Sequence, residues 1–362
     1  MEGVHVAGLR FAALLQSGPP WLEPAWVALS SAADPRHLFT AAFPLCWWLG
    51  PAPGAALLWG ALVAEWLNVV LKWLLFGERP FWWVHESGMA AREPLGLRQF
   101  PVTCETGPGS PSGHCMVTGA ALWPLVSALS SLVSARSGSP VLRIIPFAAY
   151  ILLMVAVGLS RVFVLAHFPH QVVAGILAGA VLGWGLQGRT PGSPRAFACA
   201  ALVLPLSALI LRWVLRAAGL DIDWCGSPPR SCVPAPWLCP RPTAAVPRRS
   251  LRLAAQWCSS AAWLRRDSRP LASLWRDAGS ALGLALAAAS PAPRLGPWQR
   301  LAGAAAAVAA VQGLHRLREP QDATLWYGSS ALRYAAGPWI VASLLPRLLA
   351  ALGRVGGAPH RE

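Results

Sequence analysis

Long stretches without charge constrain this chain more than any other feature. A helix that crosses a membrane needs about 20 predominantly apolar residues. The first stretch is longer than one crossing, and its Pro51-Ala52-Pro53-Gly54 cluster predicts a turn between two helices. We therefore predict an all-α, polytopic membrane protein with about nine transmembrane helices packed as a bundle. The uncharged stretches are 37–64, 115–135, 144–160, 168–188, 196–211 and 278–293, with shorter ones at 301–314 and 334–346.

The composition supports this class. Only 12% of the 362 residues are charged, whereas soluble domains carry about a quarter. The formal net charge is +15, and such an excess can indicate nucleic-acid binding when the basic residues cover a soluble surface. Here the only lysine, Lys72, lies inside an apolar segment, and the arginines fall mostly between apolar runs. We therefore expect a lipid bilayer, and no nucleic acid, as partner.

The placement of the arginines predicts how the chain is oriented in the membrane. Three short loops are flanked by arginines and contain no acidic residue, and alternating spans bring all three to the same side. Positive residues favour the cytosolic side, so the opposite side holds the N-terminus, the 77–113 loop and the long 212–276 loop. The arginine pairs that flank the short loops are Arg136 and Arg143, Arg189 and Arg195, and Arg294 and Arg300.

Five basic side chains lie at or near predicted span ends on that opposite face: Lys72, Arg79, His114, Arg161 and His167. Any one arginine there could simply anchor a helix at the interface. Together they could bind a doubly negative phosphoryl group, because guanidinium groups contact phosphate oxygens in pairs and an ammonium adds a point charge.

The motifs that carry these residues form a pattern. Lys72 is followed after six residues by Arg79-Pro80, then come Pro111-Ser112-Gly113-His114 and Ser160-Arg161, and His167 follows after five more residues. This order resembles the three-part signature of the type 2 phosphatidic acid phosphatase superfamily. The longer segments Lys72–Val84, Cys104–His114 and His167–Gln171 resemble the glucose-6-phosphatase catalytic subunits, most closely their ubiquitous third-isoform group.

The resemblance implies a helical-bundle phosphatase core and a role for each motif residue. His167 would be the nucleophile that forms a phosphohistidine, and His114 the proton donor to the leaving group. Lys72, Arg79 and Arg161 would bind the substrate phosphate. The start of the helix at Ser112 and Gly113 would add free N–H groups for the anion. Because cationic side chains take the place of Mg²⁺, we expect no metal and no other cofactor.

One departure concerns the residue that orients the nucleophile. The wider superfamily often has Asp four residues after the nucleophilic His, whereas this chain has Gln171, as the glucose-6-phosphatases do. Asp34 and Glu105 are our candidates for orienting His167 or for contacting the sugar.

The chain is predicted to form one core in two parts, residues 1–224 and 257–362. Between them, residues 225–256 form a Pro-, Arg- and Cys-rich lumenal insertion that we expect to be disordered. Its first part, 225–250, has no counterpart in the family, so it is either a real insertion or a gene-model artefact. Four of the eight cysteines lie in the 212–276 loop, and sequence does not fix their pairing.

The resemblance implies hydrolysis of glucose 6-phosphate and related sugar 6-phosphates in the endoplasmic reticulum membrane, with a lumenal active site. A charged substrate does not cross lipid, so a glucose-6-phosphate transporter is the expected functional partner. Two alternatives stay open: a lipid phosphate phosphatase of the same superfamily, and a catalytically silent membrane scaffold.

Overall fold

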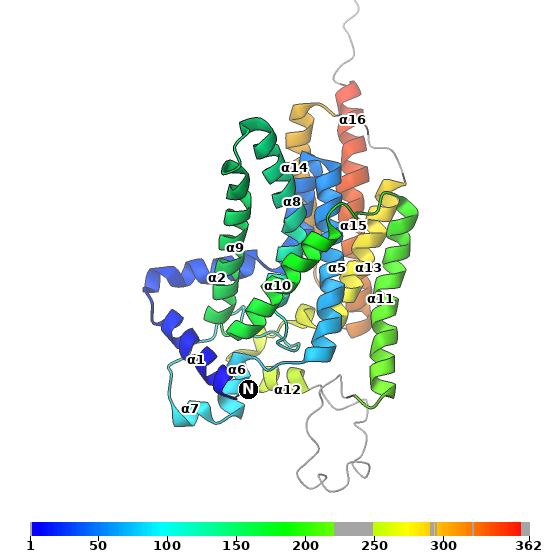
Figure 1. Ribbon diagram of the computed structural model, residues 1–362. Coiled ribbons are helices and arrows are strands. Elements are labelled where there is room, and N and C mark those ends of the chain that lie inside the picture. The colour runs from blue at the N-terminus through cyan, green and yellow to red at the C-terminus, as the bar shows by residue number, and fades with distance from the viewer. Residues whose placement is uncertain (1, 221–248, 290–292, 294, 321, 356–362) are drawn as a thin grey trace, which may run out of the picture.

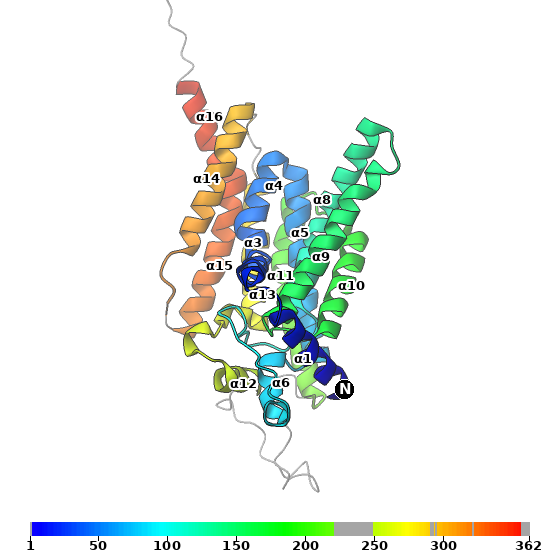
Figure 2. The same cartoon turned by 90° about the vertical axis from the view of Figure 1, so that its left-hand side faces the viewer.

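The computed structural model describes residues 2–220, 249–289, 293, 295–320 and 322–355. In these residues the secondary structure is helical, and the only β pairing is a single bridge between Glu105 and Arg265. The long helices run side by side as a bundle, with shorter helices gathered at one end (Figures 1 and 2). The all-α prediction is therefore confirmed.

Six helical segments among the described residues are long and apolar enough to cross a membrane. They contain α5 (Pro51–Leu75), α8 (Gly113–Ser137), α9 (Ile145–Phe163), α10 (Pro169–Leu186), α11 (Pro194–Ala217) and α15 (Ala323–Trp339), which continues toward α16 (Leu345–Val355).

The predicted count of nine spans is not confirmed. The three other predicted spans are helical, but they do not meet the length and apolarity of a crossing helix. They contain α3 (Pro35–His37) with α4 (Phe43–Leu49), α13 (Pro270–Ala288) and α14 (Pro297–His315). The helix α13 carries adjacent charges at Arg276 and Asp277, which explains why it falls short by composition.

Proline sets where several of these helices begin. Helix α10 begins at Pro169, α13 at Pro270 and α14 at Pro297. A proline suits this position because its missing N–H would have no helical partner there. The start of each helix thus determines where the preceding loop ends, as for the loop before α10 that carries His167.

The outer faces of the bundle are apolar. On α11, the side chains of Leu202 and Leu206 are 70% and 57% exposed. Large contiguous apolar surfaces of this kind are rare on soluble proteins, and they suit contact with lipid. The chain is therefore a multi-pass membrane protein.

Helices α13 and α15 pack closely through glycine. A Cβ atom at Gly283 would lie 2.0 Å from the backbone oxygen of Ala335, and one at Gly279 would lie 2.3 Å from that of Ala331. Any other residue would force the two helices apart, as in the small-residue contacts of membrane helices. This contact aligns α13, which carries residues that face the site.

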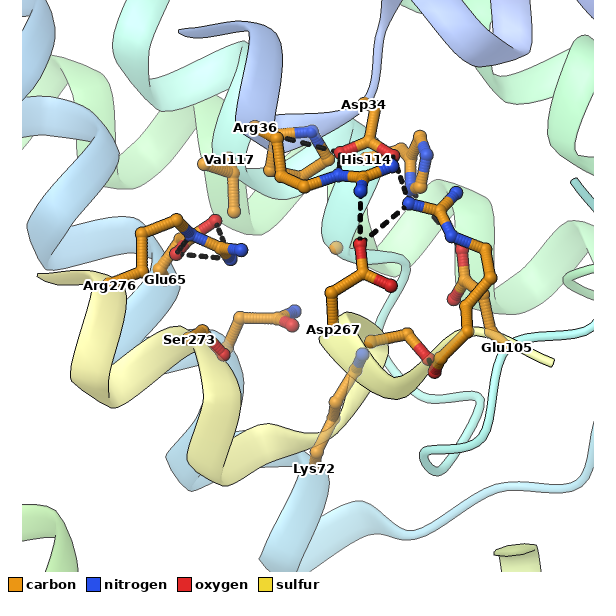
Figure 3. Close-up of a pocket in the computed structure, with 15 residues that line it drawn as sticks. Asp34, Arg36, Glu65, Lys72, Glu105, His114, Val117, Asp267, Ser273 and Arg276 are labelled. Atoms are coloured by element: carbon orange, nitrogen blue, oxygen red, sulfur yellow. Dashed lines mark hydrogen bonds and ion pairs between the residues drawn. The ribbon is translucent and has the colours of Figure 1, made fainter. Parts of the chain in front are cut away.

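A buried ion pair joins α13 to α5. The Arg276 guanidinium donates to both carboxylate oxygens of Glu65, at 2.6 Å, and neither side chain is more than 8% exposed. Two charges at this depth are stable only as a pair. Figure 3 shows the pair at one edge of the pocket that Lys72 and His114 also line.

The short helices cover one end of the bundle. They are α1 (Glu2–Gln16), α6 (Pro80–Glu86), α7 (Met89–Arg92) and α12 (Arg249–Trp257), and Figure 1 shows them at its lower end. The α8–α9 hairpin and the start of α14 lie at the other end. Helix α2 (Glu23–Ala32) packs beside α9.

The segment predicted as a disordered insertion, 225–256, is ordered at its C-terminal end, so that boundary was wrong. Residues 221–248 lie outside the described residues. From Arg249 onward the chain forms α12, whose Leu253 and Ala254 are fully buried against Phe81 and Trp82. A disulfide between Cys104 and Cys258 ties the end of this helix to the core.

The Glu65–Arg276 pair predicts a stability difference. Arg276→Met leaves an unpaired buried carboxylate, so it should destabilise the protein by about 3–5 kcal/mol. The double variant with Glu65→Met should recover most of this loss. Thermal unfolding of the purified protein in detergent measures both. Equal melting temperatures for the wild type and Arg276→Met would contradict a stabilising role for the pair.

Candidate active site

The loop between α9 and α10 presents His167. This histidine is completely buried, and its Nδ1 lies 2.8 Å from the carbonyl oxygen of Gly109. A carbonyl can only accept, so Nδ1 carries the proton and Nε2 keeps its lone pair. Nε2 faces the site, 3.4 Å from Nη1 of Arg79. A backbone contact thus determines which ring nitrogen of His167 keeps its lone pair.

Gln171 supports this orientation. Its Oε1 lies 3.3 Å from Nδ1 of His167 and accepts from the N–H of Phe168, while its Nε2 donates to the backbone oxygen of Glu78 at 2.7 Å. Gln171, four residues after His167, therefore contacts the same ring nitrogen, Nδ1, as the carbonyl oxygen of Gly109. The candidates Asp34 and Glu105 do not contact Nδ1.

Burial lowers the pKa of His167 well below its ordinary value, and the neighbouring cation Arg79 lowers it further. The imidazole is therefore neutral at physiological pH. A neutral ring with a free Nε2 lone pair is the form required of a nucleophile.

Arg79 is fixed by backbone carbonyls. Its guanidinium donates to the oxygens of Gly107, Pro108 and Ala166 at 2.7, 3.0 and 3.0 Å, and the side chain is fully buried. The chain turns into α6 at this residue because Pro80 follows it. One face of the guanidinium fork remains directed at the site.

Arg161 approaches from the last turn of α9. It is also fully buried, and its Nη1 donates to the hydroxyl of Ser30 at 2.5 Å. Its Nε has no hydrogen-bond partner within the described part of the chain. Ser30 comes from α2 and was not predicted, because nothing in its local sequence distinguishes it.

Glu105 occupies the space between the two arginines. Its Oε2 lies 2.8 Å from Nη1 of Arg79, and its Oε1 lies 2.5 Å from Nη2 of Arg161. The same carboxylate lies 3.6 Å from His114 and 3.9 Å from Nε2 of His167. Burial would raise the pKa of Glu105, but Arg79 and Arg161 lower it well below its ordinary value. An anion therefore stands where both histidines and both arginines meet.

His114 and Lys72 complete this cluster. His114 lies in the first turn of α8, directly after Ser112 and Gly113, and its buried Nε2 has no partner in the described regions. Lys72 projects from the last turns of α5 into a pocket that Gly113 also lines (Figure 3). Its ammonium has no ion pair among the described residues. The site thus has cationic capacity beyond what Glu105 neutralises.

A chamber of about 60 Å³ adjoins the cluster. Asp34 lies at its border and caps α3 through the N–H of Arg36 at 3.0 Å. Its other oxygen accepts from Arg265 at 2.5 Å, and Arg265 also pairs with Asp267 at 2.9 Å. Figure 3 shows Asp267 below Arg36, between the site and Ser273. The sequence did not single out Arg265 or Asp267, because they lie in an arginine-rich segment with no distinguishing motif.

The chemistry of the cluster is that of phosphoryl transfer. A neutral histidine and a second histidine both approach the carboxylate that lies between two guanidinium groups, and an ammonium lines the same pocket. Such groups stabilise the charge on the equatorial oxygens of a transferring phosphoryl group. No group of three or more His, Cys, Asp or Glu side chains able to hold a metal ion occurs among the residues that the structure describes.

Comparison with known proteins agrees with this chemistry. Residues 53–189 match the model of the PAP2 superfamily. Glucose-6-phosphatase 3 of Rattus norvegicus is 42% identical over 370 residues, which cover 100% of both chains. The protein of the same name from Homo sapiens is 42% identical over 354 residues, or 96% of this chain and 95% of the relative. Glucose-6-phosphatase catalytic subunit 1 of Rattus norvegicus is 31% identical over 380 residues, 100% of this chain and 98% of the relative. No solved structure matches the chain significantly.

The position of Glu105 predicts a change in anion affinity. Glu105→Gln keeps the size of the side chain but removes the anion that occupies the cationic site. Inorganic phosphate or orthovanadate should then bind at least about tenfold more tightly, because an entering anion no longer meets a like charge. Isothermal titration of the purified protein measures this.

A matched control is Glu86→Gln, an acidic residue at the end of α6 that pairs with Trp257 and not with the cationic cluster. Its affinity for phosphate should equal that of the wild type. Weaker phosphate binding in Glu105→Gln than in the wild type would mean that the carboxylate assists the anion rather than competing with it.

Proposed function

Because this chain belongs to the glucose-6-phosphatase family of the PAP2 superfamily, we propose that it is a membrane phosphohydrolase of sugar phosphates. It cleaves glucose 6-phosphate, and related sugar 6-phosphates, to free sugar and inorganic phosphate. The observation that carries the proposal is the meeting of His167 and His114 at one anion position between Arg79 and Arg161.

The first step transfers the phosphoryl group to the protein. Nε2 of neutral His167 attacks phosphorus, so that a P–N bond forms while the ester P–O bond breaks. His114 gives its proton to the sugar oxygen as it leaves. The sugar departs as a neutral alcohol, and the phosphoryl group remains on His167 as a phosphohistidine.

The second step releases phosphate. His114, now neutral, removes a proton from water, and the water oxygen attacks phosphorus while the P–N bond to His167 breaks. The two histidines return to their starting protonation states. The cycle therefore consumes one water molecule and leaves the number of protons on each ring unchanged. The two histidines approach different oxygens of the Glu105 carboxylate, at 3.6 and 3.9 Å, which supports this division of roles.

The phosphoryl oxygens replace the Glu105 carboxylate. Arg79 and Arg161 would contact them as they now contact Glu105, and Lys72 would supply the third cation. The backbone oxygens that hold Arg79 leave its guanidinium no freedom to follow the substrate, so the charge is preorganised. At the start of α8 the N–H of Ser112 donates to the backbone oxygen of Gln171 at 3.1 Å, so the N–H of Gly113 would be the one that contacts the phosphate.

The chamber beside the anion position favours a sugar over a lipid as the leaving group. It is lined by charged and hydroxyl side chains, among them Asp34, Asp267 and Ser273, which suit a sugar hydroxyl beside the ester oxygen. An acyl chain would require an apolar opening instead. We therefore propose Asp34 as a sugar contact, in keeping with its place at the chamber border.

The active-site face is proposed to be lumenal, in the endoplasmic reticulum membrane. The Cys104–Cys258 disulfide lies on that face, and disulfides persist in oxidising compartments. Arg136 and Arg143 lie at the other end, in the α8–α9 hairpin, where positive residues favour the cytosol. A lumenal site requires a glucose-6-phosphate transporter as functional partner.

The mechanism predicts a covalent intermediate on His167. Brief incubation with glucose 6-phosphate labelled at phosphorus should give an acid-labile, base-stable phosphoprotein. His167→Ala should abolish the label, because no other nucleophile faces the phosphorus. His114→Ala should retain a measurable label while it loses turnover, since attack on phosphorus does not require His114 as nucleophile. Undiminished labelling of His167→Ala would disprove the assignment.

The lumenal site predicts latency. In sealed endoplasmic-reticulum vesicles that lack a transporter, glucose 6-phosphate should be hydrolysed slowly, and detergent should raise the rate because the charged substrate then reaches the site. A phosphatidic acid assayed in parallel should remain uncleaved. If detergent exposes cleavage of the lipid but none of the sugar phosphate, the substrate class is wrong. Equal sugar hydrolysis before and after detergent would place the site on the cytosolic face.

A further inference from the structure

A second cavity, of about 220 Å³, adjoins the active chamber. It lies among α3, the start of α13, the end of α14 and α15. Arg36, Asp267 and Arg276 line both spaces, so these side chains form the wall between them. At roughly 30 Å³ per molecule, the cavity would hold about seven waters, which is room for a pyranose ring and its hydroxyls.

The charges around this cavity are already neutralised. The Lys72 ammonium and the phosphate-binding arginines line the active site, not the second cavity. A phosphate ester would thus find no uncompensated cation there, whereas a neutral ligand with many hydroxyls would find donors and acceptors. Each guanidinium group that lines the cavity has a carboxylate partner: Arg36 with Asp267 at 2.7 Å, Arg276 with Glu65 at 2.6 Å, and Arg333 with Glu319 at 3.7 Å.

One buried polar atom at this cavity lacks a partner. His315, at the end of α14, lines the space, and its Nε2 is buried without a hydrogen bond from any described residue. An unsatisfied buried group of this kind costs free energy unless a ligand or water meets it. The His315 ring packs against Tyr334 at 4.4 Å between centroids, and Trp326 also lines the wall. Aromatic faces beside hydrogen-bonding groups match the two kinds of surface that a sugar ring presents.

We propose that the second cavity binds a neutral hexose, namely the sugar that leaves the active chamber after the ester is cleaved. The identity of this sugar rests on the proposed function. The Arg36–Asp267 pair separates the two spaces, and the side chain of Arg36 is 41% exposed. The active chamber, at about 60 Å³, holds the reacting centre, and the larger cavity receives the product.

The test is glucose binding to the full-length protein in detergent, with orthovanadate filling the phosphate site. Saturation-transfer NMR or calorimetry should detect glucose bound to the wild type. His315→Phe keeps the ring contact with Tyr334 but removes the unsatisfied nitrogen, so it should weaken glucose binding about tenfold. Ser330→Trp fills the cavity and should abolish binding.

The control is Ser134→Trp, the same substitution at a half-buried serine near the other end of α8, which should bind glucose as the wild type does. Melting temperatures establish that each variant is folded, and His315→Phe decides the matter if Ser330→Trp does not fold. Unchanged glucose affinity in His315→Phe and Ser330→Trp would overturn the proposal. So would the absence of glucose binding to a wild type that hydrolyses glucose 6-phosphate. If the wild type does not hydrolyse this ester, the proposed function fails. The glucose measurement then still tests whether the second cavity binds a neutral hexose.

Discussion

The carboxylate of Glu105 between two fully buried arginines is the interaction on which the site depends. Two guanidinium groups that face each other without water repel strongly and are stable only if an anion lies between them. The free protein supplies this anion from its own chain. In the proposed function a phosphoryl group, which carries more charge and three oxygens, would meet the same requirement. The fold is therefore stabilised by an interaction that the proposed substrate would replace.

Charge compensation continues outward from this centre. Asp34 and Asp267 balance Arg36 and Arg265 around the chamber, and Glu65 balances Arg276 farther along α13 and α5. Each of these arginines therefore has a carboxylate partner. Lys72 is the cation lining the chamber that has no ion pair among the described residues. Although many arginines lie near this end of the bundle, the uncompensated positive charge of the chamber is therefore at Lys72.

Much of the site could be predicted from the sequence, because its motif residues lie at the ends of long apolar helices. Alternating spans bring Lys72, Arg79, His114, Arg161 and His167 to one face whatever the exact packing, and the structure brings them together. Ser30, Arg265 and Asp267 could not be predicted in this way. They come from short segments without periodicity, and their positions depend on tertiary contacts that local sequence does not specify.

The nine-span count shows a related limit. Uncharged runs identified helical segments correctly, but an uncharged run of 14–16 residues does not establish a crossing, and 278–293 excluded the charged half of α13. Arg276 and Asp277 lie there because α13 faces the bundle interior, where Glu65 pairs with the arginine. A charge within an apolar helix of this bundle therefore marks the face that points inward rather than the end of the helix.

The disulfide explains how the site tolerates a long connection between α11 and α12. Cys104 directly precedes Glu105, and Cys258 begins the segment that leads to Arg265. The N–H of Arg265 donates to the oxygen of Cys104 at 3.2 Å. These links hold Arg265 and Asp267 beside the loop that carries Glu105, independently of the chain between the two helices. Closing a longer loop costs only slightly more entropy, so the connection can vary in length and composition while the chamber wall stays in place. The disulfide at Cys104 thus links the chamber wall at Arg265 and Asp267 to Glu105, the residue that lies between the two buried arginines.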